Sequence, residues 1–341
     1  MSAFDDARLD DPDALAAADD LLRPLAEAGA RLRREAERAQ PALDALAGET
    51  RPRAVIAVGP EARLLRAMLE PVCPVPFLAW PSLGLPGWVG PLDLVVVLGG
   101  SGDHAGPAAH EALRRGSRLV VVAPEDSTLW RQAESRSTTL LPTAAGFDPF
   151  PVALVALNAL HAFGLAAPAS ATRVADALDE VAKQCSYALD PTENPAKRLA
   201  IELADAQPLL WGGSVLAARA SRRIAEAVRT ASGRVALAED AGELLPLLAA
   251  TPARDPFADP IEDETDLRPA LVIVDDGSGD AENAAQREAL EGNAEVVDVR
   301  VCQIEHTEGE PLERYATVLS HGLFGAAYLQ IGLGRVSPWR T

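Results

Sequence analysis

The residues best suited to hold a charged group follow a strongly apolar run. Leu94 to Leu98 is typical of a buried parallel strand, and a glycine-rich turn over residues 99–103 then leads into a helical pattern. Ser101 or Asp103 could cap that helix, so that backbone N–H groups point beyond the end of the strand. Such a position favours an anion, most simply a phosphate, and Ser101, Gly102 and Asp103 are therefore candidate phosphate-binding residues. The alternative is a turn that needs glycine only for its backbone angles.

The composition limits what the ligand and partners can be. The chain has 341 residues, of which 48% are apolar, and a formal net charge of -19 at pH 7. A field of that sign repels nucleic acid and anionic membranes, so neither is an expected partner. An anionic small substrate would need a local positive site. The turn after Leu98 matches neither a Walker A loop nor GxGxxG, and we expect no cofactor and no metal.

The cysteines and the N-terminus indicate a reduced, cytoplasmic setting. Cys73, Cys185 and Cys302 form no CxxC pair, which argues against a disulfide framework or a zinc site, and small buried hydrophobes are their expected role. Acidic residues occupy the N-terminus, where a signal peptide would need positive charge. No run of about twenty apolar residues is present to span a membrane.

Alternating apolar runs and helical patterns predict how the candidate residues are positioned. Strands are predicted between residues 50 and 145 at 53–58, 75–80, 92–98, 118–123 and 138–141. This βαβ alternation predicts a parallel sheet with right-handed crossovers. A second α/β series follows Asp190-Pro191, with strands predicted at 208–211, 234–237, 271–274 and 296–301 and a terminal helix over 311–331.

These elements suggest a division of the chain into domains. Two α/β lobes with parallel sheets flanked by helices are the expected architecture. The Gly-Gly-Ser turn at 212–214 is chemically similar to the Gly-Gly-Ser turn at 99–101, which is a sign of internal duplication. The expected segments are N-terminal helices over 1–47, a first domain over 48–165, a connecting helix and linker over 166–192, and a second domain over 193–341 with an acidic loop at 252–268.

Several short stretches carry a resemblance to a known family. Residues 193–197, Glu-Asn-Pro-Ala-Lys, resemble a segment of the bifunctional phosphoglucose/phosphomannose isomerases, which have two sugar isomerase (SIS) domains. Residues 308–314, and Gly322 with Tyr328-Leu329, agree with the end of that family's sequence, and Ser101-Gly102 fits part of its S-x-S-G-x-T phosphate loop. The resemblance covers most of the chain from about residue 50. It implies doubly wound SIS-type lobes, a homodimer, and glucose 6-phosphate, mannose 6-phosphate or fructose 6-phosphate as ligand.

The chain departs from that family at its functional motifs. The glycine-rich first turn is shortened to residues 58–61, and Gly99 and His104 stand where the phosphate loop would have two hydroxyl side chains. Residues 148–151 contain no arginine where the family has one after the last strand of the first lobe. The stretch that supplies the family's catalytic carboxylate faces residues 235–240, where no clean match can be made.

The resemblance still suggests residues for aldose–ketose isomerisation, which needs a base to move a proton between C1 and C2 and an acid to open the ring. Glu239 or Asp240 could be the base, because both follow a predicted strand, although a carboxylate of so acidic a chain is more usually a solvated surface group. His321 on the terminal helix and His306 after the strand at 296–301 are the acid candidates. Glu239 with His321 is the favoured pair.

Other charged residues have more than one interpretation. Lys197 could neutralise a sugar phosphate, as the resemblance implies, or form a salt bridge with Glu193 one helical turn away. His104 and His110 lie at the phosphate turn or on its helix, while His161 sits on an apolar helix where core packing is expected.

The sequence therefore predicts a sugar-phosphate-binding SIS protein in which aldose–ketose isomerase activity is weak or lost. An active phosphoglucose/phosphomannose isomerase with a diverged carboxylate base is one alternative, and a purely structural dimer element is another. The eroded turns disfavour the first alternative, and the retained Ser101-Gly102 disfavours the second.

Overall fold

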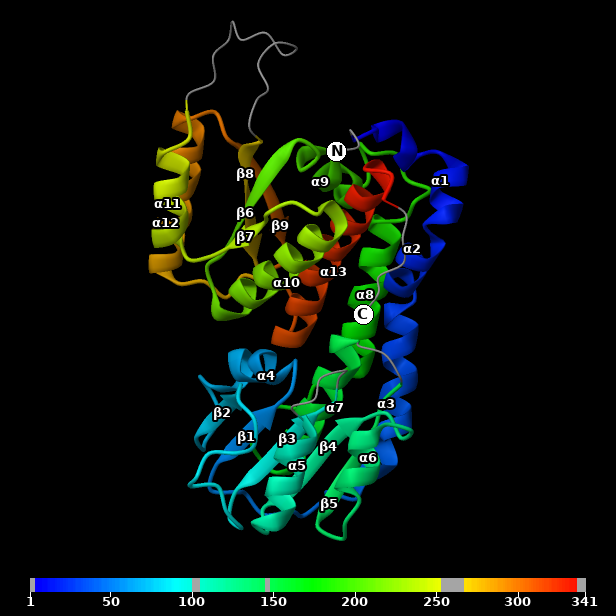
Figure 1. Cartoon of the computed structure of the whole chain (residues 1–341), viewed down its shortest axis with the longest axis vertical. Helices are drawn as coiled ribbons and strands as arrows, with labels where there is room; N and C mark the ends of the chain where they lie inside the picture. Colours follow the sequence, from blue (N-terminus) through cyan, green and yellow to red (C-terminus); the bar gives the residue numbers. More distant parts are fainter. Residues whose placement is uncertain (1–3, 100–104, 145–147, 253–266, 336–341) are drawn as a thin grey trace, which may run out of the picture. The chain divides into compact units, whose positions relative to one another are not determined.

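The computed structural model of the chain describes residues 4–99, 105–144, 148–252 and 267–335. Contacts divide the chain into two compact units, Gly29–Ala175 on the one hand and Met1–Ala28 with Asp176–Thr341 on the other. We call them the first and the second unit. Each contains one parallel sheet flanked by helices, which confirms the predicted mixed α/β class (Figure 1). The first 28 residues group with the second half of the chain.

The first unit contains a five-stranded sheet in the order β2-β1-β3-β4-β5. All neighbouring strands are parallel, with Val55 of β1 opposite Phe77 of β2 and Leu94 of β3. Every residue of β1 and β3 is buried, as expected for strands covered on both faces. The five predicted strands are confirmed, with small changes at their ends: β1 Val55–Val58, β2 Phe77–Trp80, β3 Leu94–Leu98, β4 Arg118–Ala123 and β5 Thr138–Pro142.

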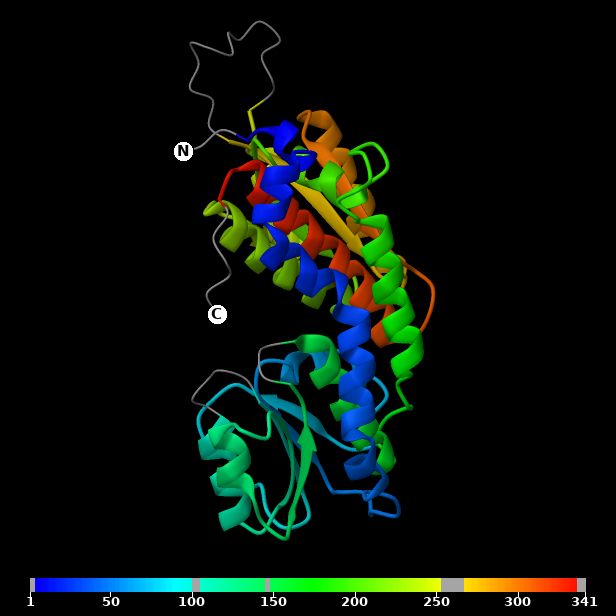
Figure 2. The ribbon, with the colours of Figure 1, turned by 90° about the vertical axis from the view of Figure 1, so that its right-hand side faces the viewer.

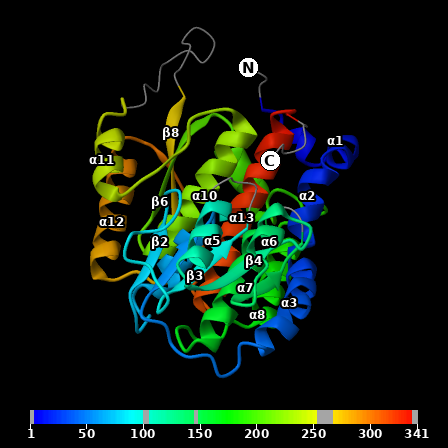
Figure 3. The ribbon, with the colours of Figure 1, turned by 60° about the horizontal axis from the view of Figure 1, so that its bottom comes forward.

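Helices cover both faces of this sheet. Helices α5 and α6 pack on β3, β4 and β5, whereas α4 packs against β1 and β2 and α7 packs against β3 and β4 on the other face. Figures 1 and 3 show α5 and α6 side by side over the sheet. Small alanines of α5, namely Ala105, Ala108, Ala109 and Ala112, meet the valines of the strands. The helices of the first unit are α3 Ala28–Asp44, α4 Ala62–Leu69, α5 Ala105–Arg114, α6 Thr128–Ala133 and α7 Pro149–Ala162.

Two glycines allow close backbone approaches where β1 and β3 end. Gly59 has a φ of +119°, and a Cβ placed on it would lie 2.2 Å from the carbonyl oxygen of Leu98. A Cβ on Gly99 would lie 2.8 Å from the Cβ of Ala123. Only glycine fits these two positions without a shift of the neighbouring backbone. The turn residues thus have a packing role that the sequence alone left open.

The second unit contains a four-stranded parallel sheet in the order β7-β6-β8-β9. Its strands are β6 Ala206–Gly212, β7 Leu237–Ala238, β8 Arg268–Asp275 and β9 Arg300–Glu305. The strand predicted at 296–301 was wrong at its start, because α12 continues to Val296 and Asp298 turns the chain with a φ of 54°. Val296 is 83% exposed, so the apolar run there does not mark a buried strand.

Helices again cover both faces of the second sheet. Helices α11 and α12 pack together on one face, over a core of Leu209, Leu244, Leu271 and Leu290. Helices α10, α13 and α9 cover the other (Figure 1). Helix α8, Ala171–Gln184, begins in the first unit and continues into the second. The other helices of the second unit are η1 Asp6–Leu9, α1 Pro12–Ala17, α2 Asp19–Ala26, α9 Pro195–Glu202, α10 Val215–Ser232, α11 Ala241–Ala249, α12 Ala281–Val296 and α13 Pro311–Gly332.

Helix α13 is the central helix of the second unit. It contacts α10, α9, η1 and α2, and Figure 2 shows η1 and α2 beside it. Close packing is possible because a Cβ on Gly322 would lie 2.3 Å from Ile224, and one on Gly325 would lie 2.6 Å from Leu199. The apolar surface of α13 is therefore used inside the unit. The expected homodimer remains a prediction.

Two other expectations concern bulk properties of the chain. Among the described residues, no helix combines the length and the apolarity that a bilayer crossing requires. Cys185 is buried, as predicted, and burial raises the pKa of its thiol to about 12. Cys73 and Cys302 are half-buried instead.

The Gly59 turn gives a first test of the fold. We expect Gly59→Ala to lower the free energy of unfolding by about 2 kcal/mol or more, because the new Cβ meets the Leu98 carbonyl in a strained backbone. Gly87→Ala is the matched control, since nothing lies within 4 Å of its Cβ position. Urea denaturation of both variants makes the comparison, and equal stability would contradict the close approach.

Candidate functional site

The strand orders place one candidate site at the carboxyl edge of each sheet. In a doubly wound sheet, ligands bind where neighbouring strands send their crossovers in opposite directions. That point lies between β1 and β3 in the first sheet and between β6 and β8 in the second. In the first sheet, Gly59 and Gly99 end the two strands. The predicted phosphate residues Ser101, Gly102 and Asp103, and His104 with them, lie outside the described residues.

Arg31 on α3 supplies a positive charge beside Asp148, in the loop between β5 and α7. Residues 148–151 contain no arginine of their own, but Nε of Arg31 on α3 donates to Oδ2 of Asp148 over 2.5 Å. Asp148 also caps α7, since its Oδ1 accepts from the Phe150 N–H at 3.1 Å. Sequence reasoning missed Arg31 because 117 residues separate it from Asp148.

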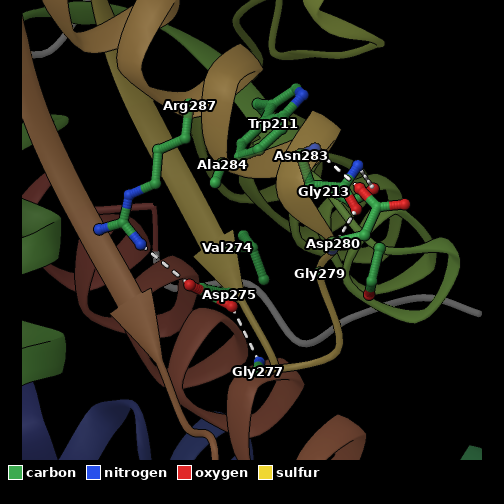
Figure 4. A pocket seen from close by; sticks show the side chains of 11 residues that line it. Trp211, Gly213, Val274, Asp275, Gly277, Gly279, Asp280, Asn283, Ala284 and Arg287 are labelled. Carbon is green, nitrogen blue, oxygen red and sulfur yellow. Dashed lines mark hydrogen bonds and ion pairs between the residues drawn. The ribbon is translucent and has the colours of Figure 1, made fainter.

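The second sheet has a described pocket at its switch point. The pocket has a volume of about 200 Å³ and lies at the carboxyl ends of β6 and β8 and the start of α12 (Figure 4). Its lining residues with polar side chains are Trp211, Ser214, Asp275, Asp280, Asn283 and Arg287. Trp211 and Asp275 lie at the ends of β6 and β8, and the other four come from the turns that follow these strands and from the first two turns of α12.

Hydrogen bonds tie these two turns together. Oδ1 of the buried Asp276 accepts from the Ser214 hydroxyl at 2.6 Å, and its Oδ2 accepts from the Ser278 hydroxyl at 2.7 Å. Ser214 in turn caps α10 by accepting from the Ala217 N–H. Nδ2 of Asn283 donates to the Gly213 carbonyl at 2.8 Å. The polar groups of this edge are therefore engaged with one another.

The positive end of α12 is also occupied by protein groups. Asp280 caps the helix by accepting from the Asn283 N–H at 2.9 Å, while the Asn283 side chain accepts from the Asp280 N–H at 3.0 Å. A carboxylate thus lies where an anion would be favoured. This arrangement closes the turn and disfavours a phosphate there.

Arg287 is the cationic group of the pocket, and it is paired. It donates to Asp275 at 2.9 Å and to Glu291 at 3.0 Å. Burial lowers the pKa of its guanidinium, but the hydrogen bond with Glu291 and the charges of Glu291 and Asp275 outweigh burial, so the net shift is upward. The pocket therefore offers a neutralised cation beside acidic groups, which is a weak setting for an anionic ligand.

A repeat in the sequence could have revealed this second turn. The tetrapeptide Gly-Ser-Gly-Asp occurs after β3, at 100–103, and again after β8, at 277–280. These two sequence segments hold equivalent positions in the strand orders, because β3 lies beside β1 as β8 lies beside β6. The predicted likeness between residues 99–101 and 212–214 therefore paired the wrong turns, because 212–214 follows β6 and corresponds to the Gly59 turn.

Lys197 has a different environment from the one expected. Its side chain is fully buried, and Nζ donates to Oδ1 of Asp10 at 2.6 Å and to the carbonyls of Tyr187 and Leu189 at 3.0 and 2.8 Å. The ammonium also lies 5.8 Å from the ring centre of Tyr328. These three acceptors use all three ammonium protons, so the geometry favours a structural role over phosphate binding. The salt-bridge partner is Asp10, whereas Glu193 was the expected one.

Asp10 provides a test of this role. We expect Asp10→Asn to lower the free energy of unfolding by roughly 1–3 kcal/mol, because it leaves a buried ammonium group without its countercharge. Asp13→Asn, an exposed neighbour on α1, is the control and should have little effect. The measurement is chemical denaturation at pH 7, and a loss no greater than the control's would contradict the assignment.

The proposed acid–base residues lie on different elements. Glu239 directly follows β7 and is exposed, and its N–H donates to the Leu210 carbonyl at 3.3 Å. His321 is half-buried on α13, with Nε2 3.2 Å from Oε1 of Gln184. His306 follows β9, and its N–H donates to the Asp275 carbonyl. Each candidate thus has its own protein partner, and the roles of Glu239 and His321 remain predictions.

The remaining histidines are surface residues where the structure describes them. His110 is exposed on α5. His161 is also exposed, with Nδ1 2.9 Å from the Ala166 carbonyl, so its expected core packing was wrong. It lies in the last turn of α7, beyond the buried part of that helix.

The environment of His321 determines its charge. Burial, with a contribution from His306, lowers its pKa to about 4, against an opposing hydrogen bond with the Thr317 backbone. The imidazole is therefore uncharged at neutral pH. An uncharged ring can accept a proton or donate a hydrogen bond, but it is not an imidazolium acid.

This shift predicts a pH dependence of stability. The folded pKa lies below the ordinary value of 6.5, so the stabilisation is fully present above pH 6.5 and is lost as the pH falls through about 4. In the wild type, this group should lower the free energy of unfolding by on the order of 2–3 kcal/mol between pH 7 and pH 4, and we expect this loss to be absent in His321→Gln. Unfolding free energies across this range, with His110→Gln as control, measure it. Identical pH profiles of wild type and His321→Gln would contradict it.

Comparison with solved structures defines the class of fold. Tagatose-6-phosphate ketose/aldose isomerase from Escherichia coli aligns with a TM-score of 0.63 at 13% identity, over 95% of this chain and 97% of that one. The C-terminal domain of glucosamine-fructose-6-phosphate aminotransferase from Francisella tularensis aligns at 0.62 and 11% identity, over 92% and 96%. A glucose-6-phosphate isomerase like protein from Thermus thermophilus gives 0.51 at 19% identity, over 88% and 91%. At these identities the alignments show the fold alone.

The sequence match is narrower and more specific. Residues 192–335 match the family model described as the bacterial phospho-glucose isomerase C-terminal SIS domain. The chain thus resembles the phosphosugar isomerase-like SIS proteins, as its short motifs indicated, and the family match lies in its second half. No curated protein gives a significant match to the chain.

Proposed function

We propose that this protein binds sugar phosphates at the carboxyl edge of its first sheet and interconverts their aldose and ketose forms weakly or not at all. The main support is the pair of glycine turns at the β1/β3 switch point. Gly59, after β1, lies close to Leu98 at the end of β3, and Gly99, two residues before Ser101, lies close to Ala123 of β4. The equivalent edge of the second sheet is closed by its own side chains, so the first sheet is the better location.

Three sugars are candidate ligands: glucose 6-phosphate, mannose 6-phosphate and fructose 6-phosphate. Ser101, Gly102 and Asp103 are the proposed phosphate-binding residues, on the sequence evidence. Lys197 is left out of the proposed site because its three protons are used within the second unit.

The expected weakness of turnover rests on the base. A carboxylate base is usually tuned toward neutral pH by burial and by its neighbours. Glu239 is exposed to solvent. His321 is uncharged and so has no imidazolium proton to give to the sugar ring oxygen. Positioning alone can hold the sugar, but the proton transfer between C1 and C2 needs a base within reach.

Coupled assays and melting curves test this proposal together. We expect turnover of glucose 6-phosphate and mannose 6-phosphate to be very slow or absent, and either sugar phosphate to raise the melting temperature, because a ligand of the folded state stabilises it. Ser101→Ala should weaken binding roughly ten- to a hundredfold, the cost of one hydrogen bond to a charged group.

Two outcomes would favour the alternatives. Fast turnover that falls by a factor on the order of 10²–10⁴ in Glu239→Gln would identify an active isomerase with Glu239 as base. No turnover and no shift in melting temperature would leave a structural role, and light scattering would then decide whether the protein is a homodimer.

A further inference from the structure

An open hollow lies at the amino edge of the first sheet, away from the proposed sugar-phosphate site. Its volume is about 570 Å³, within the usual range for small-molecule sites. Arg53 and Leu92 lie just before β1 and β3, and Arg118 is the first residue of β4. The hollow is lined by Glu49, Thr50, Arg51, Pro52, Arg53, Pro91, Leu92 and Arg118.

The charge of this hollow is unusual for the chain. Three arginines and a single carboxylate, Glu49, line it, in a protein whose formal net charge is -19. Arg53 is paired with the buried Asp93 and Arg118 with Glu49, so the positive charge of Arg51 is left over at this edge. Strand carboxyl ends are the common location of substrates in α/β folds, so a ligand here would occupy a separate place.

Two of the guanidinium groups are held in place before any ligand arrives. Arg53 donates through Nε and Nη2 to the buried carboxylate of Asp93, at 2.9 and 2.7 Å, and lies 6.0 Å from the ring centre of Trp88. Arg118 donates through Nη1 to Glu49 at 3.0 Å and lies 5.4 Å from the ring centre of Phe163. Groups ordered in advance lose less entropy when a ligand binds.

Donors remain available on all three arginines. Within the described residues, Arg51 uses Nη2 for a hydrogen bond to the Gly164 carbonyl, at 3.1 Å. Arg53 uses Nε and Nη2, the latter also for a hydrogen bond to the Trp88 carbonyl, so its Nη1 remains as a donor. Arg118 uses Nη1, so its Nε and Nη2 remain. Arginine presents its N–H groups in a fixed fork that suits phosphate oxygens.

We propose that this hollow binds a phosphorylated small molecule carrying several negative charges, as a second site separate from that of the sugar phosphate. Arg51 and Arg118 contact the phosphate oxygens, and Arg53 offers Nη1 as a further donor while remaining tied to Asp93.

Calorimetric titration of the full chain with inorganic pyrophosphate tests the proposal. We expect a saturable heat whose affinity falls as salt is added, because the contacts are largely electrostatic. Arg51→Gln with Arg118→Gln should weaken this binding about tenfold or more. The control is Arg63→Gln with Arg222→Gln, which removes the same charge from exposed positions elsewhere. This control should leave the affinity for pyrophosphate nearly unchanged.

Two further measurements make the result decisive. Arg51→Gln alone should weaken binding while its melting curve stays that of wild type, since Arg51 is exposed and makes a single described hydrogen bond. Pyrophosphate should bind with the same affinity in the presence of excess glucose 6-phosphate, which separates this hollow from the sugar-phosphate site. No heat with wild type, or equal affinity in the Arg51/Arg118 double variant, would overturn the proposal.

Discussion

Parallel strand pairing is the constraint on which both sheets of this protein depend. A strand that pairs in parallel with its neighbour must return by a crossover, so all turns of one kind gather at one edge. The strand orders β2-β1-β3-β4-β5 and β7-β6-β8-β9 then create a point at which two neighbouring crossovers diverge. The chemistry of each unit is decided by which residues occupy that point, and the two units fill it differently.

The same topological position is open to different uses. After β6 and β8, Ser214, Asp276 and Asn283 bond to one another and to backbone groups, so the edge is consolidated from within. After β1 and β3, Gly59 lies close to Leu98 and Gly99 lies close to Ala123, and residues 58–61 contain one polar side chain, that of Glu61. Duplicated architecture therefore need not mean duplicated binding, because a carboxylate at a helix start can take the place of a bound anion.

Local patterns made most of the fold predictable. The strands of the first sheet are short apolar runs buried on both faces, and each was located to within a few residues. The start of β9 was missed because Val296 is apolar but exposed at the end of α12, and the left-handed Asp298 separates helix from strand. Contacts distant in sequence were not predictable. Lys197 pairs with Asp10 across 187 residues, whereas a periodic pattern suggests only partners one turn away.

The composition of the second unit has a consequence for synthesis on the ribosome. Its first 28 residues are made early, yet their partners are Lys197 and the end of α13, where the Gly332 carbonyl accepts from the Asp5 N–H. At usual translation rates that end emerges on the order of tens of seconds later. The residues of the first unit are complete long before then and can fold. The leading helices therefore cannot make these contacts until the last helix has been synthesised.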